Sequence, residues 1–356
     1  MTCIAAFIIL AIAGVFVAFI SIFKPKVGKR YLKMLKKSWG CFGKRITLQK
    51  CETGFGDEVK NSVLSRVLLK SPKLVKPLSI AIEVLSVLLV VVTIWSVVES
   101  AKAGLALWSL GTCNVKHAEA CTLGSEVCSI DDNSEPQNPI EAIGFWFSDW
   151  GEIFGAIPDK FRGWDVNQFD FAGIEVGEGD LKAIDIFDPG CIVCLQSFRV
   201  QLESGFFDNG KTLLVPFPIQ DNEGKFKYPN SKLIVGYVFG ADKADAKTAD
   251  GKKVSYEIVR RIYVDKADVD GIEYPYQNMF NEFYSSEEAE AKLKEWLVEY
   301  GLDEETQTKI SEFAHSDEYE EIVKKNNNIV VNDIHAKGIP TMIYDGGKHI
   351  GKYEAN

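Results

Sequence analysis

Two long apolar runs limit what this chain can fold into more strongly than any other feature. Residues 1–23 contain no charged side chain, and residues 78–98 contain only Glu83. At about 1.5 Å of rise per residue, a helix of either length crosses a hydrocarbon core of about 30 Å. We therefore expect two transmembrane helices. A cleaved signal peptide is the alternative for the first run, although that run has no basic start and no small-residue cleavage site.

Charge is distributed unevenly on the two sides of the second run. The segment 24–77 carries a formal charge of +12, from fifteen Lys or Arg against three acids. Because the whole chain carries −10 and the second run holds only Glu83, the residues after Val98 carry −21. Short basic loops stay in the cytoplasm, so we expect 24–77 to be cytoplasmic and the chain from about residue 100 onward to be extracytoplasmic. We expect the loop to lie on anionic lipid rather than to bind nucleic acid.

The rest of the chain divides into three segments. Residues 99–137 form a linker with three cysteines, and residues 138–163 form an aromatic amphipathic segment that either rests in the membrane interface or packs on the next domain. Residues 164–356 have the pattern of a mixed α/β domain, with predicted strands at LKAIDIF (181–187) and TLLVPFPI (212–219). The stretch GIPTMIYDGGKHIGKY predicts a terminal hairpin. The section in between, about 221–333, is predicted to be mostly helical.

The stretch DPGCIVCLQSF places two cysteines, Cys191 and Cys194, where a predicted strand ends and a predicted helix begins. A helix N-terminus lowers the pKa of a thiol, so Cys191 is the expected nucleophile. Cys194, one turn later, is placed to attack a mixed disulfide and resolve it. Half of a zinc site and two inert core thiols are the alternatives. No second pair lies at zinc-site spacing, and we predict redox chemistry and no metal.

Two further residues fit a redox site. Asp185 lies six residues before Cys191 on the inward face of the strand, where a buried carboxyl with a raised pKa could exchange a proton with Cys194. Pro340, between Ile339 and Thr341 at the start of a strand, could form a cis peptide that offers the backbone of Ile339 to an extended substrate. A surface acid and an ordinary trans proline are the alternatives.

These motifs together resemble the thioredoxin superfamily. The matching features are the acid before the first cysteine, the C-x-x-C at the helix start, and the run GIPT before a terminal hairpin. The long helical section before that run is similar to the DsbA-like branch. The resemblance covers about residues 164–356 and implies a thioredoxin-like α/β fold with a helical insertion, preceded here by the two transmembrane helices. It implies Cys191 as nucleophile, Cys194 as resolving thiol, Asp185 as buried acid, and a substrate-binding loop at Ile339, Pro340 and Thr341.

The chain departs from that pattern in three places. Ile192 and Val193 stand between the cysteines where the family commonly has Pro, His or Gly-Pro, so no polar group stabilises the thiolate beyond the helix end. We expect a potential nearer to that of thioredoxin, about −270 mV, than to that of DsbA, about −120 mV. Asp188 would further disfavour a thiolate. The chain also lacks the closing helix after the hairpin.

The remaining cysteines divide by predicted compartment. Cys113, Cys121 and Cys128 are expected outside, where disulfides persist, as one stapling disulfide with one leftover thiol. A zinc site of these three cysteines with His117 is the alternative. Cys41 and Cys51 fall in the predicted cytoplasmic loop and are expected to be reduced.

These expectations combine into a two-pass membrane protein that displays a thioredoxin-like domain outside the cell. We expect it to exchange disulfides with exported proteins, with no cofactor and with a redox partner that the sequence does not identify. A non-catalytic binding or chaperone module of a membrane complex is the alternative. That alternative predicts that function survives Cys191→Ala.

Overall fold

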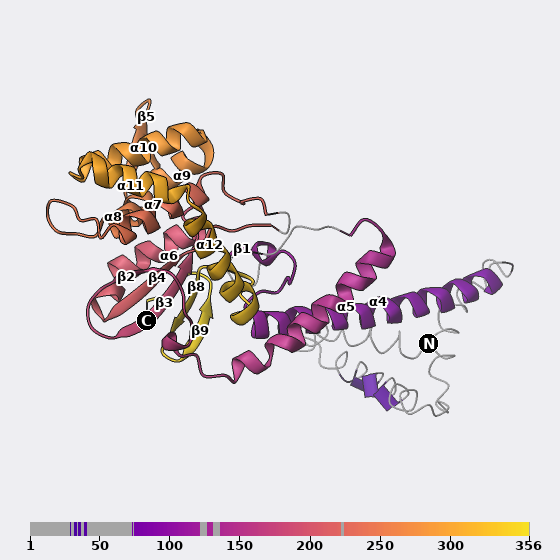
Figure 1. Cartoon of the computed structure of the whole chain (residues 1–356). Helices are drawn as coiled ribbons and strands as arrows, with labels where there is room; N and C mark the ends of the chain where they lie inside the picture. Colours follow the sequence, from indigo (N-terminus) through magenta and orange to yellow (C-terminus); the bar gives the residue numbers. More distant parts are fainter. Residues whose placement is uncertain are drawn as a thin grey trace. The chain divides into compact units, whose positions relative to one another are not determined.

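The computed structural model describes residues 75–121, 127–130, 136–221 and 224–355, together with positions 29, 32, 33, 35, 36, 39, 40 and 73 (Figure 1). The chain forms two compact units, Met1–Ala101 and Lys102–Asn356. The first predicted transmembrane helix, 1–23, and most of the predicted basic loop lie outside the described residues. Only the second of the two predicted spans is therefore described.

Helix α4, Val75–Leu110, contains the whole second predicted span and extends beyond it at both ends. Among the described residues it is the one helix long and apolar enough to cross a membrane. Its polar side chains Ser86, Thr93 and Ser100 each donate their hydroxyl to the carbonyl four residues earlier. These groups are therefore satisfied within the helix, as an apolar environment requires.

The aromatic amphipathic segment forms helix α5, Pro139–Ala156. Asn138 caps it by accepting a hydrogen bond from the backbone N–H of Glu141. Ile153 and Ala156 are buried in a small cluster with Ala106, Leu110 and Val115, in the part of the chain that belongs to the second unit. The helix therefore packs on the residues around the end of α4, while the apolar side chains Ile140, Ile143, Phe147 and Phe154 remain exposed.

A five-stranded sheet forms the centre of the second unit. Its strands are β2 (Ile174–Val176), β3 (Leu181–Phe187), β4 (Lys211–Pro216), β8 (Thr341–Tyr344) and β9 (Gly347–Ile350), in the order β2-β4-β3-β8-β9. Strands β3 and β4 are parallel and are joined through α6, Ile192–Glu203; the other pairs are antiparallel. The topology is that of a thioredoxin-like fold.

The two prolines of the predicted strand 212–219 favour an edge strand or an early stop. The structure shows the early stop: β4 is an interior strand of the sheet and ends at Pro216. At the other side of the sheet, Asp345 and Gly346 have positive φ values of 50° and 72° and form the tight turn between β8 and β9. The predicted hairpin is confirmed.

The helical insertion lies between β4 and β8. Its helices are α7 (Ser231–Lys243), α8 (Val254–Val264), α9 (Tyr276–Asn278), α10 (Ser286–Glu299), α11 (Glu304–Ala314) and α12 (Asp317–Asn328). Ser285 and Glu288 form the predicted capping box of α10. Gly236 and Gly240 let α7 approach α11 closely, because a Cβ at Gly240 would lie 2.8 Å from the carbonyl oxygen of Ile310. The same section contains an unpredicted hairpin of β5 (Lys266–Val269) and β6 (Ile272–Pro275).

No helix follows β9 in the described residues up to 355. Instead, the Tyr353 ring packs edge-on against Phe206, with ring centroids 4.9 Å apart. The backbone N–H of Tyr353 donates to Ser197 Oγ of α6 at 3.0 Å. The terminal residues therefore contact the face of the domain that carries α6.

Candidate active site around Cys191

The loop Asp188–Gly190 carries Cys191 to the start of α6. Cys191 is the N-cap residue, and its Sγ accepts a hydrogen bond from the backbone N–H of Cys194 at 3.4 Å. This contact is of the kind that stabilises negative charge on sulfur at a helix N-terminus. Cys191 and Cys194 are both buried, whereas Ile192 between them is 49% exposed. The expected arrangement of strand, turn and helix around the cysteine pair is present.

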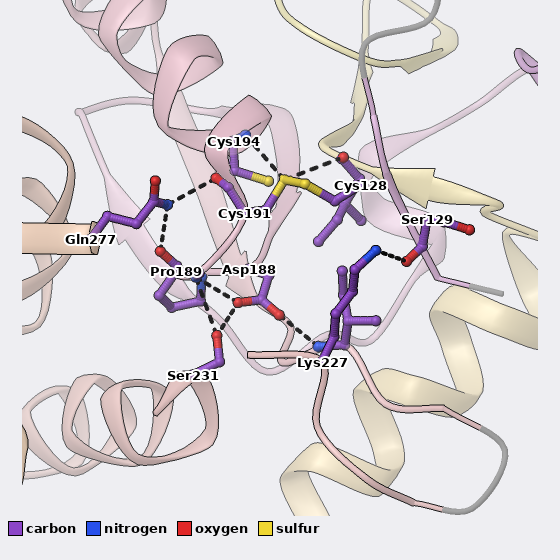
Figure 2. Close-up of a disulfide and its surroundings, with 12 residues drawn as sticks. Cys128, Ser129, Asp188, Pro189, Cys191, Cys194, Lys227, Ser231 and Gln277 are labelled. Carbon is purple, nitrogen blue, oxygen red and sulfur yellow. Dashed lines mark hydrogen bonds between the residues drawn. A yellow bond between two sulfur atoms is a disulfide. The ribbon is translucent and has the colours of Figure 1, made fainter. Parts of the chain in front are cut away.

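Cys191 forms a disulfide with Cys128, and Cys194 is a free, buried thiol (Figure 2). Figure 2 shows the sulfur of Cys194 beside this bond. Cys113 and Cys121 form another disulfide among the described residues, which is the staple predicted for the linker. The prediction of a leftover thiol in the linker is wrong, because Cys128 is bonded to Cys191. These two disulfides also exclude the zinc site of Cys113, His117, Cys121 and Cys128.

Strand pairing explains why Cys128 reaches the site. Strand β1, Cys128–Ser129, pairs antiparallel with β7, Gly338–Ile339, and Cys128 lies opposite Ile339. The carbonyl oxygen of Ile339 is in turn 3.8 Å from Cys191 Sγ. The backbone of one loop therefore contacts both partners of the disulfide. This pairing joins residues far apart in sequence, so the cysteine spacing did not reveal it.

The loop opposite Cys191 contains the expected proline. The Ile339–Pro340 peptide bond is cis, as predicted. Thr341 Oγ1 donates to the carbonyl of Gly338 at 2.6 Å, which closes the turn around the proline. Ile339 and Thr341 are fully buried. Ile339 has its backbone facing Cys191 and β1, the position at which an extended chain could be bound by strand addition.

Two buried carboxyl groups adjoin the thiol of Cys194. Burial raises the pKa of Cys194 well above its usual value, and the charges of Asp185 and Asp188 raise it further. Burial also raises the pKa of Asp185 to about 6, against a hydrogen bond that Gln201 Nε2 donates to Asp185 Oδ2 at 2.9 Å. Asp185 Oδ1 has no partner among the described residues. The predicted burial of Asp185 is confirmed, whereas its partner Gln201 lies outside any motif and was not predicted.

Asp188 shapes the loop from within. Its carboxylate accepts hydrogen bonds from the backbone N–H groups of Gly190 and Ile219, each at 2.7 Å, and from the hydroxyl of Ser231. Burial raises its pKa to about 6, although these bonds and the charge of Lys227 oppose the shift. The acid therefore acts as an acceptor that fixes the turn before Cys191, and its charge also disfavours the Cys194 thiolate by raising the pKa of that thiol.

The helical insertion supplies hydrogen-bond donors to every carbonyl of this loop. Tyr263 Oη donates to Asp188 O at 2.8 Å, and Asn281 Nδ2 donates to Gly190 O at 2.8 Å. Gln277 Nε2 donates to both Pro189 O and Cys191 O, at 2.7 and 2.9 Å (Figure 2). These three residues could not be predicted, because they lie in helical or connecting segments without a motif. A buried loop requires such partners.

No group of three or more His, Cys, Asp or Glu in the described part of the chain is placed to hold a metal ion. The chemically active groups at this site are a disulfide, a thiol and two carboxyls. Such a set can exchange disulfides without a cofactor, because one thiolate attacks a disulfide and another leaves.

No protein-family model matches the chain, and no curated protein matches it significantly by sequence. Solved structures similar to it include the thiol-disulfide oxidoreductase MdbA of Corynebacterium matruchotii, at 15% identity and a TM-score of 0.37 over 58% of this chain and 96% of that one. The catalytic domain of Proteus mirabilis ScsC is 12% identical, with a TM-score of 0.33 over 52% and 84%. The thiol-disulfide exchange protein alpha-DsbA2 of Wolbachia pipientis is 13% identical, with a TM-score of 0.34 over 52% and 82%. The fold assignment rests on the sheet topology.

Proposed function

We propose that this chain is a thiol-disulfide oxidoreductase that works through Cys191 and Cys194. One observation carries the proposal: the Cys191 disulfide lies at the N-terminus of α6 with the thiol of Cys194 beside it (Figure 2). The carbonyl oxygen of Ile339, in the cis-proline loop, lies 3.8 Å from Cys191 Sγ. A thiol in the first turn of a helix, next to a disulfide that it can attack, is the arrangement that disulfide exchange needs.

The proposed reaction has two exchanges. A substrate thiolate attacks Cys191 Sγ of a Cys191–Cys194 disulfide, and Cys194 leaves as a thiolate. A second thiolate of the substrate then attacks the substrate sulfur that is bonded to Cys191. This step forms the substrate disulfide and releases the Cys191 thiolate. The substrate loses two electrons and the cysteine pair gains them. Reversing the steps reduces or isomerises a substrate disulfide.

Asp185 is the proposed proton donor and acceptor for Cys194. Its pKa of about 6 is close to ambient pH, which suits a group that must both give and take a proton. The burial that raises the pKa of Cys194 makes its thiolate costly, so proton transfer to the leaving sulfur would favour the exchange. Ile339 and Pro340 are the proposed docking point for an extended substrate segment, with Thr341 holding the turn.

We further propose that the domain acts outside the membrane on exported proteins. The charge asymmetry around residues 78–98 and the apolar helix α4 support membrane anchoring. The disulfide Cys113–Cys121 supports an oxidising compartment, because disulfides persist there and are rare in the cytosol. Residues 1–23 are proposed as the other span, and the basic loop as a lipid-facing cytoplasmic segment.

The test is a redox titration of the full-length chain in glutathione buffers, with the state of Cys191 determined by alkylation and mass spectrometry. We expect a reversible transition at Cys191 and loss of activity toward a reduced dithiol peptide in Cys191→Ser. The double variant Cys113→Ser, Cys121→Ser is the control, since neither of these bonded cysteines takes part in the proposed exchange. If Cys191 never changes state, or if Cys191→Ser retains function, a non-catalytic binding module is the better account.

A further inference from the structure

Residues 127–130 occupy the position that the proposed function assigns to a substrate. They carry the sequence Val-Cys-Ser-Ile, and all four are buried. The backbone of this segment pairs with the cis-proline loop through β1 and β7, and the Ile130 N–H donates to Lys337 O at 3.1 Å. Lys227 Nζ donates to Ser129 O at 3.5 Å (Figure 2). The segment is therefore held along its length, and not only by the disulfide.

The fit extends to the side chains. At Gly338, directly across from β1, an added Cβ would lie 2.8 Å from the Cβ of Val127. The absence of a side chain at Gly338 thus makes room for the apolar residue that precedes the cysteine. Ile130, two residues after the cysteine, is also part of the main core cluster.

We propose that residues 127–130 are a built-in substrate strand and that Cys128 is a third redox cysteine, released when Cys194 attacks the Cys128–Cys191 disulfide. The inference rests on the proposed function and identifies the kind of substrate segment that the redox site accepts. This segment is an extended strand with one apolar residue directly before its cysteine and a second apolar residue two positions after the cysteine.

The internal exchange balances without an external reagent. The Cys194 thiolate attacks Cys191 Sγ, the Cys191–Cys128 bond breaks, and the Cys191–Cys194 bond forms. Cys128 leaves as a thiolate and gains a proton, while Cys194 has lost one. The chain holds one disulfide and one thiol among these three cysteines before and after, so nothing is oxidised or reduced overall.

The tethered strand therefore excludes thiol substrates that bind the site weakly. A tethered strand competes with free substrates at an effective concentration of about millimolar or more. If the site is open in about one molecule in ten, the apparent affinity for substrate falls about tenfold. Removing the Cys128 thiol should restore the apparent affinity for substrate.

The first experiment maps disulfides in the full-length oxidised chain by alkylation, non-reducing digestion and mass spectrometry. We expect a peptide linked through Cys128 and Cys191 in the native chain. Its fraction should rise toward completion in Cys194→Ser, which lacks the resolving thiol, and Cys128→Ser should instead contain Cys191–Cys194. The double variant Cys113→Ser, Cys121→Ser should retain the native Cys128–Cys191 fraction.

The second experiment measures oxidation of a reduced dithiol peptide. We expect Cys128→Ser to act at an about tenfold lower half-saturating peptide concentration than the native chain. In the variant Cys128→Ser, Cys194→Ser, oxidised with a glutathione disulfide at Cys191, a peptide containing Val-Cys-Ser-Ile should displace glutathione faster than one containing Glu-Cys-Ser-Glu.

The outcomes separate this inference from the proposed function. If Cys191–Cys194 forms and cycles but no Cys128–Cys191 bond appears in the native chain or in Cys194→Ser, the inference is wrong and the oxidoreductase stands. Equal rates for the two peptides also overturn it. If the Cys128–Cys191 bond is present and stays unchanged in every glutathione buffer, it is a permanent structural disulfide and both proposals fail.

Discussion

At the scale of single residues, the buried carboxyl of Asp185 should make the stability of the fold depend on pH. The pKa of Asp185 in the folded chain is about 6, whereas the pKa of an aspartate in an unfolded chain is about 3.9. Between these values the folded chain holds a proton that the unfolded chain has lost, so the contribution of Asp185 to stability is present at low pH and is lost as pH rises through about 6. The difference corresponds to about 3 kcal/mol at most.

Asp185→Asn keeps an acceptor for Gln201 and removes this titration. We expect the variant to be more stable than the native chain at pH 7.5, by up to about 3 kcal/mol, and to lose that advantage by about pH 4. Thermal midpoints of the full-length chain at both pH values measure the change. An advantage that is the same at both pH values, or larger at pH 4, would contradict the raised pKa.

Gln277 is the residue on which the Cys191 loop depends most directly, because its amide satisfies two buried carbonyls. Gln277→Met keeps the approximate size of the side chain but leaves both carbonyls without that donor. We expect a loss of about 1–3 kcal/mol in the free energy of unfolding, measured by denaturant titration. Gln307→Met is the matched control, since Gln307 Nε2 donates only to the partly buried Leu302 carbonyl. If the two variants lose the same stability, the loop does not have this dependence on Gln277.

At the scale of elements, the pairing of β1 with β7 can be disturbed without touching a cysteine. Gly338→Ala places a Cβ 2.8 Å from the Cβ of Val127, closer than side chains normally approach. We expect Gly338→Ala to lower the fraction of Cys128–Cys191 disulfide, as found by peptide mapping, because the strand no longer fits. Adding Val127→Gly removes the two nearest atoms, the Cβ and Cγ2 of Val127, and should restore the bond. Failure of Val127→Gly to rescue would show that Gly338 matters for a reason other than this contact.

The elements that the sequence predicted are those specified by local chemistry. The alternation of LKAIDIF predicted β3, the capping box predicted the start of α10, and the Asp-Gly turn predicted the β8–β9 hairpin. The pair β1–β7 could not be predicted in this way. Each strand is two residues long, and their pairing depends on tertiary contacts across the chain.

The same distinction applies to the site. Cys191, Cys194, Asp185 and Pro340 could be found because they lie in or near two short motifs. The partner of Cys191 could not be found, because several pairings of the cysteines are compatible with their spacing. Gln201, Ser231 and Gln277 were missed for a related reason. Their importance comes from the buried acceptors that they contact, and only the fold identifies those acceptors.

At the scale of the whole molecule, the helical insertion and the cysteine loop form one functional unit. The insertion contributes Tyr263, Gln277 and Asn281, whose donors hold the carbonyls of residues 188–191. It also contributes Ser231, which binds the Asp188 carboxylate. Without these partners the loop would bury unsatisfied polar groups. The insertion therefore fixes the geometry of the redox site in addition to enlarging the domain.

The proposed topology can be tested by thiol labelling on the two sides of the membrane, and a native cysteine is available on one side. The basic segment 24–77 contains Cys51, and its charge of +12 predicts that it stays in the cytoplasm. Ser286 is exposed at the start of α10 in the second unit, which is predicted to lie outside. Two otherwise cysteine-free chains, one retaining Cys51 and one carrying Ser286→Cys, therefore report on the two sides of the membrane.

A membrane-impermeant maleimide should label Ser286→Cys in intact cells and should label Cys51 only after permeabilisation. Both chains must be labelled after permeabilisation, which controls for thiols that are inaccessible for other reasons. The reverse pattern would place the domain in the cytosol, where the disulfides Cys113–Cys121 and Cys128–Cys191 would be reduced. Exported proteins could then not be the substrates. The labelling experiment therefore tests the topology on which the choice of exported substrates depends.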